Sequence, residues 1–364
     1  MDLPRESCLG CAVCVDVCPS SILGMDYDSC GFHYPVINES ECNSCEMCVN
    51  HCPILVADKA EVVPEPTVYA AYNLDLDVVY SSSSGGVFTE LASAVINQGG
   101  AVAGAAFKPD FFVEHVIIER LSDINRLRQS KYTQSSTLGI YSQIKEILDS
   151  GRMLLFSGTP CQCAAVSAYL GKPYENLYLC DLICRGVNSD LAYKKYLEWL
   201  KSKHGADICS IKIRDKTEGW QRWGIRVGFA NGQEYFSWHK ADPFMQGFLA
   251  DLYLRPCCTQ CLFKGAARQV DITLGDFWGI QGENEEALKH GISAVLVHSN
   301  NGHALFDSIK DKLYWRVSNV EACVRKNPML VKSALKNSNS QVFYLKIQTQ
   351  EDFEAAIKNM ILNI

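Results

Sequence analysis

The sequence predicts an α/β domain with a mainly parallel sheet and a β-hairpin insertion, preceded by a small, cysteine-rich α+β domain. Three observations support this fold class. One cysteine pattern occurs twice near the N-terminus, strands and helices alternate from residue 68 onward, and residues 208–236 switch to a period-two pattern with Asn231-Gly232 at a turn. The chain has 364 residues, which is enough for two or three domains.

The composition is typical of a soluble globular protein, apart from its cysteines. Hydrophobic residues make up 48% of the chain, and the longest apolar runs fall far short of the ~20 residues that cross a membrane. Residues 1–7 show no basic region followed by an apolar stretch, so we expect no secretory signal and a cytoplasmic location. The net charge of −7, without a basic cluster, makes nucleic acid an unexpected partner. In a reducing cytoplasm, the 18 cysteines are expected to bind metal or to take part in redox chemistry.

The repeated cysteine pattern predicts two iron–sulfur clusters. The run C-x-x-C-x-x-C-x-x-x-C-P begins at Cys8 and begins again at Cys42 with every offset unchanged. Three cysteines at two-residue gaps wrap a loop around one cubane cluster, whereas the cysteine before the proline reaches the other cluster. A pair of zinc knuckles is the alternative, although zinc sites more often use two separated C-x-x-C pairs. We assign Cys8, Cys11, Cys14 and Cys52 to a first 4Fe-4S cluster, and Cys42, Cys45, Cys48 and Cys18 to a second.

The remaining pattern sets the expected domains and elements. Residues 1–60 are predicted to form a bacterial-ferredoxin-like domain, residues 61–67, with two prolines, a linker, and residues 68–364 the α/β domain. Within the α/β domain we expect helices over residues 87–97, 140–148, 160–170 and 190–203, strands over residues 101–107, 153–157, 177–183, 272–274 and 294–298, and a helical C-terminal tail.

Four further cysteines form a candidate third site. Cys161 begins a helix, where free N–H groups and the helix dipole favour a thiolate. Cys184 follows a strand at the edge where α/β proteins build their sites, and Cys258 and Cys261 form a C-x-x-C loop. Spacing alone leaves a third 4Fe-4S cluster, a zinc site and buried structural cysteines open. The other cysteines are expected in the core: Cys30, Cys163, Cys180, Cys209, Cys257 and Cys323.

A serine- and glycine-rich segment precedes the helix expected at residue 87. Its hydroxyls, glycines and free N–H groups, over residues 81–86, suit a phosphate or the edge of a flavin, and a helix cap without a ligand is the alternative. For Lys131, a solvated side chain is the default expectation and a phosphate contact the alternative. No G-x-G-x-x-G fingerprint follows a strand, so we expect no standard dinucleotide site.

Six short motifs extend over nearly the whole chain: Ser83-Ser84-Gly85-Gly86, Ser130-Lys131-Tyr132, GTPCQ from Gly158 to Gln162, ICRG from Ile183 to Gly186, the pair Cys258 and Cys261, and Asp276-Phe277-Trp278-Gly279. In this order they resemble the beta-subunit family of coenzyme F420 hydrogenases and dehydrogenases. One departure is Arg185, where bacterial relatives often have histidine, so no proton-transfer role is carried over to that position.

The resemblance implies bound FAD and a further 4Fe-4S cluster in residues 68–364. Family members pass electrons between a ferredoxin-type carrier and a two-electron partner. Mapped onto the matching positions, the cluster would use Cys161, Cys184, Cys258 and Cys261, and the flavin would contact Ser83, Ser84, Gly85, Gly86, Lys131, Thr159 and Pro160.

We therefore expect an FAD-dependent iron–sulfur oxidoreductase. It would relay electrons between a ferredoxin, or another one-electron carrier, and an unidentified two-electron substrate or coenzyme, because a flavin couples one-electron to two-electron steps. The main alternative is a non-catalytic electron-transfer subunit that feeds a separate enzyme, and a further one is a binding protein pinned by structural clusters. The expected assemblies are a homo-oligomer or a complex with a partner enzyme, and no catalytic acid or base is assigned.

Overall fold

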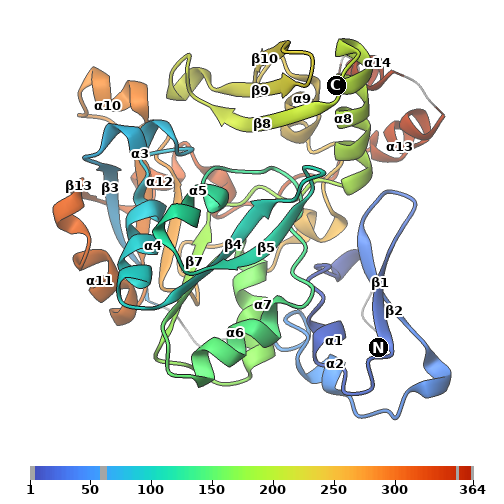
Figure 1. Ribbon diagram of the computed structural model, residues 1–364, viewed down its shortest axis with the longest axis horizontal. Coiled ribbons are helices and arrows are strands. Elements are labelled where there is room, and N and C mark those ends of the chain that lie inside the picture. The colour runs from blue at the N-terminus through green and yellow to red at the C-terminus, as the bar shows by residue number, and fades with distance from the viewer. Residues whose placement is uncertain (1–4, 58–63, 350–351, 362–364) are drawn as a thin grey trace.

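The computed structural model describes residues 5–57, 64–349 and 352–361 (Figure 1). Within these ranges the strands form three sheets: β1 with β2, the order β10-β9-β8, and a large sheet in the order β13-β3-β12-β11-β7-β6-β4-β5. We call residues 5–57, which contain β1 and β2, the N-terminal module. The large sheet lies at the centre of the rest of the chain (Figure 1).

The strands are β1 (Leu23–Tyr27), β2 (His33–Ile37), β3 (Thr67–Asn73), β4 (Ala101–Phe107), β5 (Val113–Ile118), β6 (Leu154–Ser157), β7 (Leu177–Leu182), β8 (Ile208–Asp215), β9 (Gly224–Phe229), β10 (Glu234–Trp238), β11 (Ile272–Asp276), β12 (Ser293–Val297) and β13 (Leu313–Ser318). The helices are α1 (Val13–Asp16), α2 (Met47–Asn50), α3 (Leu76–Tyr80), α4 (Val87–Asn97), α5 (Ile124–Leu127), α6 (Ile140–Asp149), α7 (Pro160–Leu170), α8 (Asp190–His204), α9 (Pro243–Leu249), α10 (Glu285–His290), α11 (Asn300–Asp307), α12 (Val320–Val324), α13 (Ser340–Gln348) and α14 (Phe353–Ile361).

Four neighbouring strands at the centre of the large sheet, β11-β7-β6-β4, run parallel. They are the parallel α/β core that the sequence predicts, with helices between them at the expected positions. Outside this centre, β5, β12, β3 and β13 pair antiparallel with their neighbours, so the complete sheet is mixed. The carboxyl ends of the parallel strands meet at one edge, where α/β proteins commonly place their ligands. We call it the carboxyl edge.

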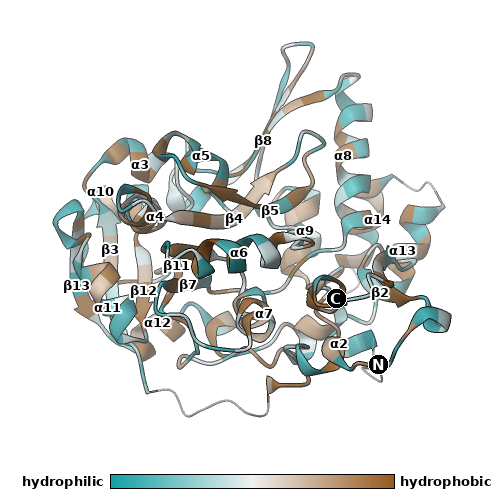
Figure 2. Cartoon of the chain, turned by 60° about the horizontal axis from the view of Figure 1, so that its bottom comes forward, coloured by the Kyte–Doolittle hydropathy of each residue, from teal (hydrophilic) through white to brown (hydrophobic). Residues whose placement is uncertain are grey.

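Alternate side chains of the central strands serve opposite layers of the core. In β6, Leu155 packs with α4 and α11, whereas Leu154 and Phe156 pack with α6 and α7 on the other face. In Figure 2 the central strands are mostly brown, and teal residues gather on the outer faces of the helices. Both faces of the sheet are therefore covered, which accounts for the continuous apolar runs of its strands.

The insertion consists of β8, β9 and β10, which pair as a three-stranded antiparallel sheet. Its second turn lies at Asn231 and Gly232, where Gly232 has a φ of 82° that favours glycine. In Figure 1 this sheet lies above β4 and β5, next to α8 and α9. It shares a core with α8, α9, α13 and α14, which include the predicted helical tail.

The N-terminal module packs against the α/β part through two cores. Val13 of α1 is fully buried among residues of α6 and α7, and Phe32 and Tyr34 join the core around α8. Residues 61–63 of the expected linker lie outside the described residues, and Thr67 already begins β3. Among the described residues, no helix combines the length and apolar character that a membrane span needs.

Candidate cofactor sites

The first predicted cysteine quartet lines a single cavity. Cys8, Cys11, Cys14 and Cys52 share this lining with apolar side chains that include Met25. Burial raises the pKa of Cys14 to about 12, and the neighbouring Cys8 and Cys52 add to the shift. Burial likewise raises the pKa of Cys11, with contributions from Cys14, Cys8 and Cys52. Thiols held this closely need a positively charged centre before all of them can ionise, as an iron–sulfur cluster provides.

The two cysteine loops repeat in backbone conformation as well as in sequence. Gly10 and Ser44, at matching positions of the repeat, have φ values of 65° and 57°, and Ala12 and Glu46 have 59° and 58°. These left-handed residues turn successive N–H groups toward one side of the loop, an arrangement that binds anions. A short helix follows each loop, α1 and α2. The local sequence therefore folds both loops in the same way.

The second predicted quartet lies nearer the surface. Cys42 and Cys45 are exposed, and Cys18 and Cys48 are half-buried. Although burial acts to raise the pKa of Cys18, backbone N–H groups of residues 20–23 lower it below its ordinary value, so they favour a thiolate there. Burial raises the pKa of Cys48, and Cys45 adds to that shift. Within the described residues, no three His, Cys, Asp or Glu side chains converge on a single metal ion.

The third predicted quartet also lines a single cavity, at the carboxyl edge of the large sheet. Cys161 lies in the first turn of α7, Cys184 follows β7, and Cys258 and Cys261 lie in and after the 3-10 helix over Pro256–Gln260. Burial, with a smaller contribution from Cys258, raises the pKa of Cys184 to about 12. Burial also raises the pKa of Cys161, and the neighbouring Cys184, Cys258 and Cys261 contribute to this increase. The structure thus brings together four cysteines from three distant segments.

Two residues belong to both cavities. Leu9 and Cys11 line the cavity of the first quartet and also that of the third. The carbonyl oxygen of Cys11 accepts hydrogen bonds from Tyr141 Oη at 2.7 Å and Thr137 Oγ1 at 2.8 Å. These bonds join the first cysteine loop to α6 and the segment before it. The two quartets are therefore separated by one shared wall.

Cationic side chains surround the third cavity. Arg185 lies in its lining and pairs with Asp251, Nε to Oδ1 at 2.6 Å. Lys264 also lies in the lining, and among the described residues its Nζ donates only to the carbonyl oxygens of Cys184 and, at 2.8 Å, Met329. Lys264 acts to lower the pKa values of Cys184 and Cys261, against the effect of burial. Its positive charge is thus available to a negatively charged group in the cavity.

The residues expected to contact a flavin lie in two places. Thr159 and Pro160 line the third cavity, where the Thr159 side chain and Gln162 form a capping box at the start of α7. Ser83 lies beside the segment that precedes Lys131, because its Oγ accepts a hydrogen bond from the Ser130 N–H at 2.9 Å. Both places are on the carboxyl-edge side of the sheet, since Gly85 contacts Ser293, which pairs with Asp276 at the end of β11.

Most polar atoms of the serine–lysine segment already have protein partners. Ser84 Oγ donates to Ile292 O at 2.8 Å, and a Cβ at Gly85 would lie 2.5 Å from Ala71 O. Gly86 is the N-cap of α4 with a φ of 83°. Lys131 is buried, in contrast to the solvated side chain expected by default, and its Nζ donates to the carbonyl oxygens of Leu127, Arg128 and Gln129. Burial lowers the pKa of Lys131 to about 7.

Two arginines near these sites were not predicted from the sequence. Arg214 is buried and donates to Ser83 O and Asp276 Oδ1, each at 2.9 Å, while its Nε has no hydrogen-bond partner in the part of the chain that the structure describes. Arg255 is fully buried in the lining of the third cavity. A usable signal for Arg255 was its place three residues before Cys258, but no prediction from the sequence used it. Arg214 offers no such signal, because its partners are remote in sequence.

The cysteines expected in the core divide in two groups. Cys163, Cys180 and Cys323 are buried as expected, whereas Cys30 is only half-buried and packs against the edge of the core around α8. Cys209 is exposed on β8, because that strand turns one face to solvent. Cys257 lines the third cavity beside Cys258, so it is not an ordinary core thiol. The spacing of the cysteines did not indicate that Cys257 lines this cavity. Adjacent side chains usually point apart, and here the 3-10 helix turns both Cys257 and Cys258 toward the same cavity.

Comparisons with known proteins agree with these two parts of the chain. Residues 7–56 match a family described as a 4Fe-4S dicluster domain, and residues 151–322 match the family of the C terminus of the coenzyme F420 hydrogenase/dehydrogenase beta subunit. An uncharacterized ferredoxin of Methanocaldococcus jannaschii is 39% identical over 49 residues, which are 14% of this chain and 62% of that ferredoxin.

A solved structure of the F420-reducing NiFe hydrogenase complex from Methanosarcina barkeri contains a chain that aligns with 83% of this chain and 93% of its own length. The identity is 18% and the TM-score 0.48. Together with the motifs, the two family matches confirm the resemblance found in the sequence. Residues 151–322 therefore belong to the coenzyme F420 hydrogenase/dehydrogenase beta-subunit family, and a 4Fe-4S dicluster domain at residues 7–56 precedes them.

Proposed function

We propose that this protein is an iron–sulfur flavoenzyme that relays electrons between a one-electron carrier of the ferredoxin type and a two-electron substrate. The carrier would meet the N-terminal module, and the substrate would bind at the carboxyl edge of the large sheet. The ligands proposed for three 4Fe-4S clusters are Cys8, Cys11, Cys14 and Cys52, then Cys18, Cys42, Cys45 and Cys48, then Cys161, Cys184, Cys258 and Cys261.

The observation that supports the proposal most is the pair of neighbouring cysteine cavities. Each is lined by one complete quartet, and Leu9 and Cys11 belong to both. Electron transfer falls off steeply with distance, so redox groups that cooperate are separated by little more than a shared wall. Because Cys42 and Cys45 are exposed, a carrier would reach the second cluster first. The cluster of the third quartet would be the innermost of the three.

The residues present fit the clusters. The quartets supply thiols, the loops supply backbone N–H groups, and Lys264 supplies positive charge without a carboxylate partner among the described residues. When bound, clusters would carry single electrons and FAD would couple them to two-electron chemistry. The chain's own part is to hold the thiols, to exclude water from the first and third quartets, and to space them.

The residues assigned to FAD fit it less well. Ser84, Gly85 and Lys131 direct their polar atoms to protein partners, and burial of Lys131 weakens its attraction for a phosphate. We therefore assign no chemical step to the flavin. This observation favours the second candidate function, a subunit without flavin that delivers electrons to a separate enzyme. The name of the matched family, a beta subunit, is consistent with such a partner.

Anaerobic purification followed by metal, sulfide and flavin assays tests the proposal. Three 4Fe-4S clusters predict about 12 iron atoms per chain and as much acid-labile sulfide. About eight would leave the two N-terminal clusters and remove the third, whereas no iron with stoichiometric zinc would overturn the proposal. The absorbance of flavin after acid release separates a flavoenzyme from a flavin-free subunit. Clusters that cannot be reduced in a redox titration would indicate a purely structural role.

A further inference from the structure

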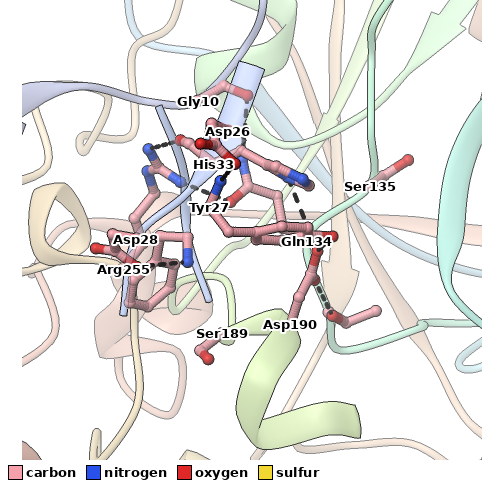
Figure 3. A network of polar contacts seen from close by, with 12 residues as sticks. Gly10, Asp26, Tyr27, Asp28, His33, Gln134, Ser135, Ser189, Asp190 and Arg255 are labelled. Carbon is pink, nitrogen blue, oxygen red and sulfur yellow. Dashed lines mark hydrogen bonds and ion pairs between the residues drawn. The ribbon is translucent and has the colours of Figure 1, made fainter. Parts of the chain in front are cut away.

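Arg255 joins the first cysteine loop to the segment that carries the third quartet. Its Nε donates to Cys8 O at 2.8 Å, and a second guanidinium nitrogen donates to His33 O at 2.6 Å. The third nitrogen donates to Gln134 Oε1 at 3.1 Å, and Gln134 in turn donates to Leu9 O at 3.0 Å. Figure 3 shows Arg255, Gln134 and His33 around the loop at Gly10. The guanidinium is thus held at the junction of the two cysteine sites.

This guanidinium is fully buried, and every acceptor that it contacts is neutral. Within the described part of the chain it forms no ion pair with a carboxylate, although Asp190 lies near enough to interact with its charge over a longer distance. Its other neighbours are the rings of Tyr34 and Phe32, at 4.6 Å and 5.6 Å from the guanidinium carbon. A buried charge without a counter-ion is costly, so an anion is expected nearby.

The two cysteine sites provide that anion. A 4Fe-4S cluster with four thiolate ligands carries a net negative charge, and the charge grows by one electron on reduction. Arg255 lines the cavity of the third quartet, and its guanidinium lies directly behind the loop of the first, since a Cβ at Gly10 would fall 2.6 Å from its Nη1. Both sites therefore lie within close range of the same positive charge.

We propose that Arg255 is a shared counter-ion of the first and third cluster sites, and that it raises the reduction potentials of both. The inference rests on the proposed function, because it requires both clusters. One charge at the shared wall favours reduction on either side, so it shifts the two potentials in the same direction and leaves the difference between them nearly unchanged. Reduction of both clusters would then fall within reach of the same one-electron carrier. Arg255 is thus a positioning residue for electron transfer and takes no part in bond making.

Lys264 provides an internal comparison. It lines only the third cavity, and its Nζ bonds to Cys184 O and Met329 O. Its charge should act on the third cluster alone, whereas that of Arg255 should act on two. Arg222 is exposed and serves as a surface control. The three positions therefore separate a shared effect, a local effect and no effect.

The test is a redox titration followed by electron paramagnetic resonance on the anaerobically purified full-length protein. Arg255→Gln should lower the potentials of the first and third clusters and spare the second, and Arg255→Lys should restore most of the loss. Lys264→Gln should lower only the third potential, and Arg222→Gln none. The signal that disappears in Cys261→Ser identifies the third cluster. Iron content, measured on each sample, reports separately on the proposed function.

The outcomes are distinguishable. Unchanged potentials in an Arg255→Gln protein that keeps about 12 iron atoms would overturn the inference and leave the proposed function standing. A shift in only one cluster would also overturn it. If Arg255→Gln loses iron, Gln134→Glu is the second variant, because it places a carboxylate beside the Arg255 guanidinium and offsets its charge without removing it. The potentials of the first and third clusters should then both fall. Unchanged potentials would overturn the inference. Wild-type protein without a third cluster would instead overturn the third-cluster part of the proposed function, and the inference with it.

Discussion

The side chain of Asp16, in α1, accepts hydrogen bonds from the N–H of Gly139 with both carboxylate oxygens, at 2.9 and 3.1 Å. Gly139 is the N-cap residue of α6. Asp16 follows the third cysteine of the first loop by two positions, so a residue of the N-terminal module caps a helix of the α/β core. The contact combines a hydrogen bond to a free N–H group with a favourable helix dipole, and it therefore anchors the module.

We expect Asp16→Ala to lower the free energy of unfolding by about 1 kcal/mol, because it removes this cap. Asp26→Ala is the matched control, since Asp26 is exposed and its carboxylate accepts a hydrogen bond only from the N–H of its neighbour Tyr27 within the described ranges. That control should change stability by less than about 0.5 kcal/mol. Denaturant titration of both variants measures the difference, and equal effects would mean that the cap contributes nothing specific.

Gly10→Ala tests the close approach of Arg255 to the first loop. Gly10 has a φ of 65°, and an added Cβ would meet a guanidinium that three hydrogen bonds hold in place. Gly151→Ala is the control, because Gly151 has a φ of 81° but open space around its Cβ. The control should cost about 1 kcal/mol for the left-handed backbone alone. Gly10→Ala should cost about 1–3 kcal/mol more, from overpacking, and a similar cost at both positions would contradict the rigid contact.

Cys261→Ser tests the third site by removing or converting one cluster. About four of the expected 12 iron atoms should be lost, and electron transfer from the N-terminal module to the carboxyl edge should slow. Cys257→Ser shows whether the adjacent thiol, which lines the same cavity, is a ligand instead. Cys209→Ser, at an exposed position, is the control. Loss of iron from Cys257→Ser but not from Cys261→Ser would reassign the ligand.

Ionisation of Asp190 should lower the free energy of unfolding as the pH rises. Burial raises the pKa of Asp190 to about 6, while hydrogen bonds from Tyr27 and Thr133 oppose the shift. The folded state therefore holds this proton more tightly than the unfolded state, whose pKa is the ordinary 3.8. Stability from this group is complete below the unfolded pKa and is lost as the pH rises through about 6. His33, which lies beside Asp190, has a pKa lowered from its ordinary value by burial.

Asp190→Asn removes that titration. The stability of the variant relative to wild type should increase by about 1 kcal/mol between about pH 5 and about pH 7.5, since a full pKa unit corresponds to about 1.4 kcal/mol. Denaturant titrations at the two pH values measure the change, and the difference between them cancels any constant effect of the lost contacts. A stability difference that is independent of pH would show that Asp190 ionises with an ordinary pKa.

The central elements were predictable because they depend on local patterns. The helix over residues 87–97 and the strand over residues 101–107 occur with the expected bounds, since apolar periodicity and glycine ends define them without reference to the rest of the chain. The outer strands β5 and β13 were not predicted. β13 is an edge strand that exposes Tyr314, Trp315 and Val317, so its apolar residues do not mark a buried face.

The sequence by itself determined the two N-terminal cysteine loops, because ligands a few residues apart need only a local backbone turn. The left-handed φ values at Gly10 and Ser44 show that turn in both copies. Only the tertiary structure decided which remote groups meet. Arg255 and Cys8 are 247 positions apart, and no local pattern connects them. Packing of the N-terminal module against α6, α7 and α8 brings that cation between two cysteine sites. Lys131 is buried by a different contact, because the carbonyl oxygens of Leu127, Arg128 and Gln129 take up its ammonium group within the α/β part.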